Sequence, residues 1–399
     1  MLNRSRLNVI LLSVALAFGM GASSLVMTTA AVVGNILATD KTLSTLPVAL
    51  MFVGTMATTV PASFLMRRIG RKAGFLIGIA IGLAGCAITT TAILGGDFVA
   101  FCAGMVLLGS STAFVQYYRF AAADTASLEF RSTAISLVMA GGVVAALIGP
   151  NLATYAKDLF APVTFAGSFA SIALLQIGAI AAISFIEIPK AAFGSSSSGG
   201  RPLLVIARQP AYVVAVVSAT LGYAVMTFVM TATPLAIVGC AYPFADAAFV
   251  IQWHVLGMFV PSFFTGRLIK RFGVLRVMAA GVMMYAGTMA FGLTGTELIG
   301  NFWAALVLLG VGWNFLYVGG TTLLTETYAP EEKAKAQALN DFTVSTTVAL
   351  ASLSSGALQA RFGWEGIVLG ILPALVVIAA AVAWLTWMRA RGEETPLQA

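Results

Sequence analysis

Apolar stretches of about 20 residues follow one another along the chain, separated by short polar segments. A helix needs about 20 mostly apolar residues to cross the hydrocarbon core of a bilayer. Composition agrees, because 59% of the residues are hydrophobic and only 9% are charged, against about 25% charged in an ordinary soluble domain. We therefore predict an all-α membrane protein with twelve transmembrane helices. Their expected ranges are 8–36, 46–66, 73–94, 98–121, 133–156, 163–186, 211–237, 246–266, 277–295, 301–325, 339–358 and 366–388.

Lysine and arginine are divided unevenly between the two sides of the predicted membrane. Cytoplasmic loops of membrane proteins carry an excess of these residues. With both termini on one side, eighteen cations of the polar segments fall there, and the other side has only Lys41, Lys157 and Arg361. The first apolar stretch continues to about residue 38, which is too long for a secretory signal, so we expect an uncleaved first helix. The sequence predicts a multi-pass membrane protein with N- and C-termini in the cytoplasm.

The sequence disfavours several function classes. The net charge of +7 comes from short cationic clusters between apolar runs, which suits membrane loops better than a nucleic-acid surface. Three scattered cysteines and one histidine give no disulfide framework or metal site. There is no Gly-Lys-Ser/Thr loop for ATP, and the loops are too short to fold as a catalytic domain. We expect a non-enzymatic protein with no cofactor or metal, functional as a monomer, whose partners are the lipid bilayer and a small-molecule substrate.

The chain is expected to consist of two halves. The longest polar interruption contains "GSSSSGG", which is typical of a flexible linker. We place an N-terminal six-helix bundle at 1–188, a cytoplasmic linker at 189–210 and a C-terminal six-helix bundle with a short tail at 211–399. An internal repeat supports this division, because a shift of about 203 residues aligns several short matches: Val26-Met27-Thr28 with Val229-Met230-Thr231, Gly54 with Gly257, Arg68 with Arg271, and Gly70 with Gly273.

Two basic loops carry a family resemblance. The segments "SFLMRRIGRK" at 63–72 and "GRLIKRFGVL" at 266–275 resemble the G-x-x-x-D-R-x-G-R-[RK] loop of the major facilitator superfamily. The positions that match, and that we take as a gating or loop motif, are Arg68, Gly70, Arg71, Lys72, Arg271 and Gly273. Arg67 stands where the family has an acidic residue, so the gating role of that residue does not carry over. The resemblance implies a transporter with its site near the midplane between the two halves.

Other stretches bear on the substrate. The segments "WHVLGMFVPSFFTGRLIKRFG" at 253–273 and "YRFAAAD" at 118–124 resemble a bacterial branch of the superfamily that includes riboflavin-uptake carriers. This resemblance implies uptake of riboflavin or a related aromatic heterocycle across the bacterial inner membrane by alternating access. The segment "GGVVAALIGPNLA" at 141–153 resembles a Gly-Pro signature of exporters, so efflux of drugs or metabolites is the alternative. A non-transporting membrane sensor or a membrane-embedded enzyme is the alternative of another class.

Ionisable side chains are costly inside a bilayer, so those within predicted spans are candidates for a transport site. Arg119 lies about twenty residues into the 98–121 span, next to Gln116 and Tyr117. Its planar donor fork suits an anionic or carbonyl group, and tyrosine rings would add stacking or hydrogen bonds. The alternative is an arginine that extends to the cytoplasmic interface or pairs with Asp124.

His254 lies about eight residues into the 246–266 span, beside Trp253. A histidine near the midplane can exchange a proton or bind a substrate. The alternative is a neutral histidine that is hydrogen-bonded to a neighbouring helix. Asp341 is either a coupling carboxylate or a helix cap in the first turn of the 339–358 span. Since no carboxylate lies at mid-span in either half, facilitated diffusion and coupling through His254 both remain open.

Aromatic residues mark a possible cavity wall. Trp313 and Tyr317 lie halfway along the 301–325 span on one helix face, and Asn314 adds a hydrogen-bonding group between them. Tyr223 and Thr227 form a comparable face in the 211–237 span. The full predicted substrate site consists of Gln116, Tyr117, Arg119, Tyr223, Thr227, Trp253, His254, Trp313, Asn314 and Tyr317, with possible coupling through His254 or Asp341.

Overall fold

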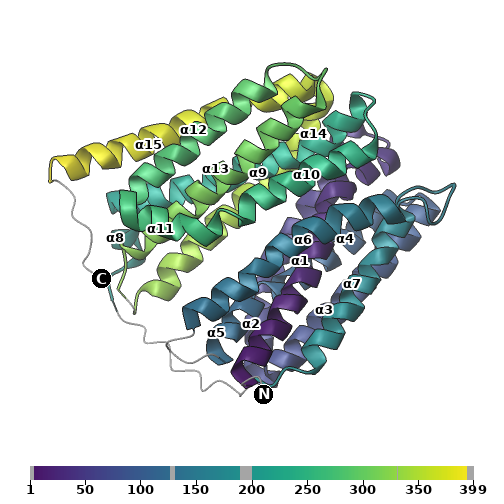
Figure 1. The fold of residues 1–399 in the computed structure, drawn as a ribbon, viewed down its shortest axis with the longest axis horizontal. Helices are drawn as coiled ribbons and strands as arrows, with labels where there is room; N and C mark the ends of the chain where they lie inside the picture. Colours follow the sequence, from purple (N-terminus) through teal and green to yellow (C-terminus); the bar gives the residue numbers. More distant parts are fainter. Residues whose placement is uncertain (1–3, 126–130, 189–199, 330, 393–399) are drawn as a thin grey trace.

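The computed structural model describes residues 4–125, 131–188, 200–329 and 331–392, and every regular element in these ranges is a helix (Figure 1). The first part of the chain forms α1 (Arg4–Leu37), the short 3-10 helix η1 (Lys41–Leu43), α2 (Leu46–Ile69), α3 (Arg71–Gly95), α4 (Phe98–Val115), α5 (Tyr118–Thr125), α6 (Arg131–Ala156) and α7 (Ala166–Ser184). The second part forms α8 (Leu203–Ala207), α9 (Pro210–Gly239), α10 (Phe244–Phe259), α11 (Ser262–Phe272), α12 (Val274–Gly292), α13 (Ile299–Thr325), α14 (Lys333–Leu369) and α15 (Leu372–Ala390).

The all-α membrane class predicted from the sequence is confirmed. In the described residues, ten helical stretches are long and apolar enough to cross a membrane, or eleven if the bent pair α10 and α11 is one span. Each predicted range overlaps one of these stretches. The ranges 339–358 and 366–388 share a single stretch, Lys335–Ala390, because no polar loop separates them and the break at Gly363 (φ 64°) takes one residue. The exact count of twelve stays a prediction.

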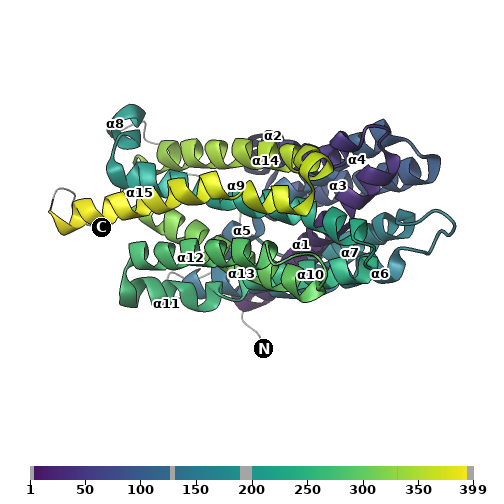
Figure 2. The same ribbon diagram turned by 90° about the horizontal axis from the view of Figure 1, so that it is seen from above.

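The helices pack as two groups, which Figure 1 shows side by side. In the first helical group, α1 to α7, α1 packs against α6 and α7, and α3 packs against α4 and α7. In the second helical group, α9 to α15, α9 packs against α13, α14 and α15, and α12 packs against α13. The groups meet where α2 lies beside α14 (Figure 2) and where α6 lies beside α10. The predicted linker lies partly outside the described residues, at 189–199, and the exact domain boundaries stay predictions.

Equivalent glycines make the same turn in both groups. Gly70 separates α2 from α3 with φ 91° and ψ 158°, and Gly273 separates α11 from α12 with φ 88° and ψ 151°. Side chains other than glycine rarely adopt such positive φ values. Cations fill the last turn of the helix before each glycine, where they also offset the negative end of the helix dipole. The loop motif therefore has a backbone function in both copies, a sharp turn between two helices.

The two ends of the bundle differ in charge and in contacts. We call the end where α2 and α11 finish the basic end, and the opposite end the far end; α1 begins and α15 finishes at the basic end (Figure 1). At the far end the two groups touch directly. The Thr45 hydroxyl accepts a hydrogen bond from the Gly356 N–H (3.0 Å) and donates one to the Leu353 carbonyl (3.3 Å). These contacts join the start of α2 to α14.

Candidate functional site between the two helical groups

Three aromatic residues that the sequence singles out come together in the second group. The rings of Trp313 and Tyr317 on α13 are stacked, with centroids 5.1 Å apart and 10° between their planes. Tyr223 on α9 lies edge-on to both, at 5.4 Å from each. The ring of Phe259, at the end of α10, lies 6.4 Å from Trp313. Helical spacing thus predicted correctly that positions 313 and 317 share a face, and the structure adds Tyr223 and Phe259 to that face.

Buried polar atoms adjoin this aromatic cluster. The indole N–H of Trp313 has no hydrogen-bond partner among the described residues, although the side chain is 93% covered. The Thr227 hydroxyl, one helical turn beyond Tyr223 on α9, is likewise buried without a partner in that part of the chain. A buried donor without a partner costs about 1–3 kcal/mol. The cluster therefore combines ring faces with donors that a bound solute can satisfy.

Arg119 is the charged residue that the first group places near this cluster. Its guanidinium lies within electrostatic range of Tyr223, Tyr317 and Asp341, all in the second group. Its Cζ stacks 4.8 Å from the Phe120 ring, and its Nε is buried without a hydrogen-bond partner among the described atoms. The alternative that Arg119 pairs with Asp124 is wrong, because Asp124 forms its ion pair with Arg71.

The residues around Arg119 mark a helix break. α4 ends at Val115, Gln116 is its exposed C-cap, and α5 begins at Tyr118. The Tyr117 hydroxyl donates to the Thr59 carbonyl on α2 at 2.8 Å, which fixes this break against α2. Gln116 and Tyr117 therefore lie beside Arg119, as predicted from their spacing, and their roles in binding stay predictions.

Asp341 is inside a helix and does not cap one. α14 begins at Lys333 and its N-cap is Glu332, so Asp341 lies eight residues beyond the helix start and the capping alternative is wrong. Its Oδ1 accepts a hydrogen bond from the Asn340 side chain at 3.0 Å. Nothing in the structure tests the coupling role; the carboxylate is exposed and lies within electrostatic range of Arg119.

His254 and Trp253 lie outside the aromatic cluster. His254 is fully buried, and its Nδ1 lies 2.8 Å from the Leu306 carbonyl on α13, which fits the alternative of a histidine bonded to a neighbouring helix. Its Nε2 has no partner among the described atoms, and its coupling role stays a prediction. The Trp253 ring is 39% exposed and packs against Trp303 and Phe249, at 5.8 and 6.2 Å.

Asn314 holds a bent helix pair together. Its amide Nδ2 donates to the Met258 carbonyl (2.7 Å) and to the Ser262 hydroxyl (2.6 Å), and its Oδ1 accepts from Thr265 (2.6 Å). These partners lie on both sides of the break between α10 and α11, where the helix axes bend by 42°. Because the amide group is hydrogen-bonded to both helices in this conformation, Asn314 positions α10 and α11 next to the aromatic cluster.

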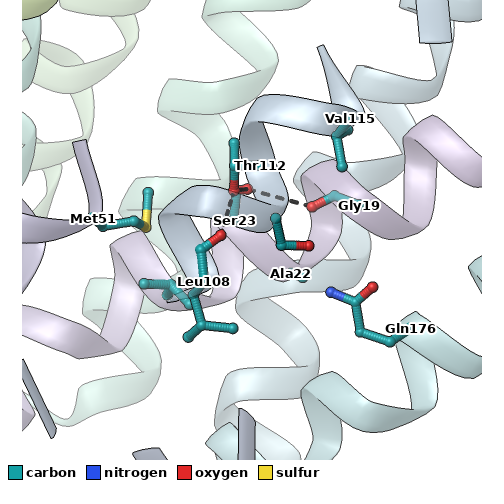
Figure 3. Close-up of a pocket in the computed structure, with 10 residues that line it drawn as sticks. Gly19, Ala22, Ser23, Met51, Leu108, Thr112, Val115 and Gln176 are labelled. Carbon is teal, nitrogen blue, oxygen red and sulfur yellow. Dashed lines mark hydrogen bonds between the residues drawn. The ribbon is translucent and has the colours of Figure 1, made fainter. Parts of the chain in front are cut away.

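A second polar group, which the sequence did not indicate, lies inside the first helical group (Figure 3). Ser23 on α1, Ser111 and Thr112 on α4 and Gln176 on α7 surround a cavity of about 10 Å³, enough for one water molecule. The Ser23 and Thr112 hydroxyls are 3.2 Å apart. Serines and threonines in apolar helices usually bond to their own backbone, so no pattern marked these.

The loop motif contacts the other stretch that carries the resemblance. Arg71, at the start of α3, forms its ion pair with Asp124 of the "YRFAAAD" segment, and Lys72 donates to the Ser184 carbonyl at the end of α7. Arg68 is exposed, and the Arg271 guanidinium lies 5.2 Å from the Phe272 ring. The first copy of the motif therefore ties α3 to α5 and α7 at the basic end.

Comparisons with known proteins agree with this architecture. A family model described as Major Facilitator Superfamily matches residues 240–399. The Riboflavin transporter RfnT of Brucella anthropi is 40% identical over 376 residues, which are 94% of this chain and 94% of that protein. The uncharacterized MFS-type transporter YddS of Bacillus subtilis is 28% identical over 87% of this chain and 85% of that protein. A solved structure of an auto-inhibited POT family peptide transporter has TM-score 0.72, covers 99% of this chain and 98% of that chain, and is 12% identical, which shows a shared fold.

Proposed function

Since the chain belongs to the major facilitator superfamily and is a multi-pass membrane transporter, we propose that it carries riboflavin or a closely related aromatic heterocycle by alternating access. The relative with 40% identity over 94% of both chains is a riboflavin transporter. In this mechanism the two helical groups rock about a site between them and expose it to one side at a time.

The aromatic cluster is the observation that favours riboflavin or a related heterocycle as the substrate. The flavin ring system is flat, aromatic and edged by carbonyl oxygens. Tyr223, Trp313 and Tyr317 offer faces for stacking, and the Trp313 N–H and the Arg119 guanidinium offer donors for carbonyl oxygens. Arg119 and Asp341, which both lie within electrostatic range of Tyr317, carry opposite charges, so the surroundings suit a solute without net charge. Gln116, Tyr117 and Thr227 complete the proposed site, and the roles of His254 and Asp341 in coupling transport to protons belong to the same proposal.

The proposed orientation follows from the cations. The basic end carries the motif arginines and both the start of α1 and the finish of α15, and Lys and Arg favour the cytoplasmic side. We place the basic end in the cytoplasm and the chain in the bacterial inner membrane, acting as a monomer surrounded by lipid. With the groups joined at the far end, the conformation described above is then open to the cytoplasm.

The decisive experiment measures accumulation of labelled riboflavin in a bacterial strain that lacks its own uptake, with and without expression of this chain. Expression should raise accumulation, and excess unlabelled riboflavin should abolish the difference. Unchanged accumulation together with increased resistance to hydrophobic compounds would replace uptake by efflux. Binding is checked separately with purified protein, because a ligand that binds the folded state raises its melting temperature.

A further inference from the structure

The two helical groups contact each other from the far end to about the middle of the bundle. Near the far end, the Asn151 amide on α6 donates to the Gln252 side chain on α10 at 2.8 Å, and the rings of Phe165 and Phe244 lie 4.8 Å apart. Further toward the middle, the Thr346 hydroxyl on α14 lies 3.8 Å from the sulfur of Met56 on α2. These contacts are neutral, and none involves a charged side chain.

At the basic end, each group is tied to itself. Arg71 pairs with Asp124 within the first group. Arg389 pairs with Glu326 (2.9 Å) and Arg201 with Glu332 (2.7 Å) at the base of the second group. Of the ion pairs between described residues, none joins the two groups. Closing this end during transport therefore requires contacts that the present conformation does not contain.

Arg119 and Asp341 lie opposite each other on this open side. The helices α2 and α14 run antiparallel, since Thr45 contacts Gly356 and, eleven residues on, Met56 contacts Thr346. Asp341 lies five residues from Thr346 toward the basic end, and Pro61 lies five residues from Met56 in the same direction. Because both helices rise by about 1.5 Å per residue, Asp341 and Pro61 lie at the same level. The Tyr117 hydroxyl is bonded to the Thr59 carbonyl at nearly the same level, and Arg119 follows two residues later.

Both charges lack a charged partner here. The Nε of Arg119 is buried without a hydrogen bond in the described part of the chain. The Asp341 carboxylate accepts a hydrogen bond from the neutral side-chain amide of Asn340. No ion pair within 4 Å involves either residue among the described atoms, although each lies within electrostatic range of the other. Arg119 is partly buried and Asp341 is exposed in this conformation, and opposite charges attract more strongly as water is excluded between them.

We propose that Arg119 and Asp341 form an ion pair across the two helical groups when the basic end closes, and that this pair holds the closed state. The inference rests on the proposed transport by alternating access. According to this proposal, neutral contacts close the far end and an ion pair closes the basic end. A solute bound at the aromatic cluster then lies beside Arg119, so its binding is sensitive to the same charge.

The pair is tested by measuring how far the basic end opens. Ile69 and Phe272 directly precede the equivalent turn glycines and are 40% and 45% exposed, so spin labels on Ile69→Cys and Phe272→Cys, in a Cys240→Ser background, report the distance between the groups. Arg119→Gln and Asp341→Asn should each reduce the short-distance population at least about twofold, and the double variant should reduce it no further than the stronger single variant. Glu326→Gln, which breaks a pair within one group, is the matched control and should change nothing. Distances that the Arg119 and Asp341 variants leave unchanged, or effects that simply add, overturn the proposal.

A covalent trap gives a second measurement. A disulfide requires Cα atoms within about 7 Å of each other, and the long arginine side chain holds the Cα atoms of an arginine–aspartate pair further apart. A short bis-maleimide should therefore cross-link Arg119→Cys to Asp341→Cys, in the Cys240→Ser background, as the basic end closes. The control pairs Arg119→Cys with Phe342→Cys, because Phe342 is the next residue on α14 and points about 100° away. Cross-linking that is equal in the two pairs contradicts the ion pair.

Both measurements are independent of the substrate. Riboflavin binding and uptake are measured on the parent protein in parallel. If riboflavin neither binds nor accumulates while the labels and the cross-link behave as expected, the proposed substrate fails and the ion pair stands. If riboflavin is transported and the charges show no coupling, the ion pair fails and the proposed function stands.

Discussion

Adjacent residues of α13 have different tasks. Trp313 turns its ring toward Tyr223 and Tyr317 and keeps a buried N–H without a partner among the described atoms. Asn314 lies about 100° further round the helix, and its amide group is hydrogen-bonded to Met258, Ser262 and Thr265. The first side chain keeps an unused hydrogen-bond donor in the aromatic cluster and the second holds the scaffold, so substitutions at the two positions should have separable effects.

Trp313→Ala should weaken riboflavin binding while the protein still folds and inserts. Loss of a stacking ring costs about 1–3 kcal/mol, which is roughly a 5- to 150-fold increase in Kd. Quenching of riboflavin fluorescence by purified protein measures this. Trp253→Ala is the matched control, because that ring packs on Trp303 and Phe249 and should leave Kd unchanged. Equal Kd values for wild type and a well-folded Trp313→Ala protein would remove the ring from the site.

Asn314→Ala should destabilise the protein. It leaves the Ser262 and Thr265 hydroxyls and the Met258 carbonyl without this partner, at a cost of about 1–3 kcal/mol for each buried group that stays unsatisfied. The melting temperature in detergent should fall clearly. Asn301→Ala, on the same helix, removes one hydrogen bond, to Gly295, and should have a smaller effect. Similar melting temperatures for the two variants would contradict the inference that Asn314 holds α10 and α11 together.

At this scale the sequence was informative where a residue type is rare in a membrane span. Trp313, Tyr317, Tyr223 and Arg119 were predicted together from spacing and cost in lipid. The three rings contact one another, and Arg119 lies within electrostatic range of Tyr223 and Tyr317. The hydroxyl cavity of Figure 3 was not predicted, because Ser and Thr are common in apolar helices. The capping alternative for Asp341 failed because α14 starts at Lys333, in a polar segment that hydropathy does not count as helix.

At the scale of elements, the closest fit between the groups joins the start of α2 to α14. The Thr45 hydroxyl bonds to two backbone groups of α14, and a Cβ on Gly356 would lie 2.5 Å from that oxygen. Such a distance is far inside van der Waals contact, so the Thr45 side chain or one of the two helices must shift if Gly356 gains a side chain. Glycine at this position permits the far end to close.

Gly356→Ala should open the far end. The added methyl separates α14 from Thr45, so conformations that are closed at the far end lose population and transport slows. Labelling of Thr45→Cys by a membrane-impermeant thiol reagent, in the Cys240→Ser background, should be faster with Gly356→Ala. Gly300→Ala is the control, because an added Cβ there meets nothing within 4 Å. Equal labelling rates in the two proteins would show that this contact does not limit closure.

A second element contact is sensitive to pH. The Arg201 guanidinium binds both oxygens of Glu332 (2.9 and 2.7 Å), and with the Ala329 N–H it lowers the pKa of Glu332 to about 2. This pair attaches the segment before α8 to the start of α14.

Because the folded-state pKa lies below the value of about 4.3 for an unfolded glutamate, Glu332 stabilises the fold above that pH, and the contribution disappears as the pH falls from about 4 toward 2. The melting temperature of the wild type should therefore be higher than that of Glu332→Gln at pH 7. The difference between the two melting temperatures should narrow between pH 5 and pH 3. Glu331→Gln, at the exposed neighbouring carboxylate, controls for the change in net charge. A difference in melting temperature that does not change with pH would exclude the ion pair as its cause.

Element positions were predictable from hydropathy, and the breaks within them were not. The predicted 98–121 and 246–266 spans are interrupted at Gln116 and near Pro261. Proline alone does not mark such breaks, because Pro61, Pro150 and Pro234 lie within continuous helices. Asn314 of another helix bonds to residues on both sides of the break near Pro261, and local sequence does not contain this tertiary contact.

For the whole molecule, the cation distribution and the internal repeat predicted two groups with their termini at one end, and the helices do pack as two groups (Figure 1). The conformational state could not be predicted, because it depends on small differences between contacts at the two ends. Thr45, Asn151 and Phe165 contact the second group at the far end, and these contacts do not require a continuous chain.

A chain divided between residues 195 and 196 should therefore still transport when both fragments are made in the same cell. The contacts of α1 with α9, α2 with α14 and α6 with α10 hold the groups together, and Arg201 stays in the fragment that contains Glu332. A tag on the first fragment should co-purify the second, and riboflavin accumulation should exceed that of cells making either fragment alone. If both fragments reach the membrane and do not co-purify, the connection between the groups is needed for assembly, and the contacts at the far end are too weak to define the closed state.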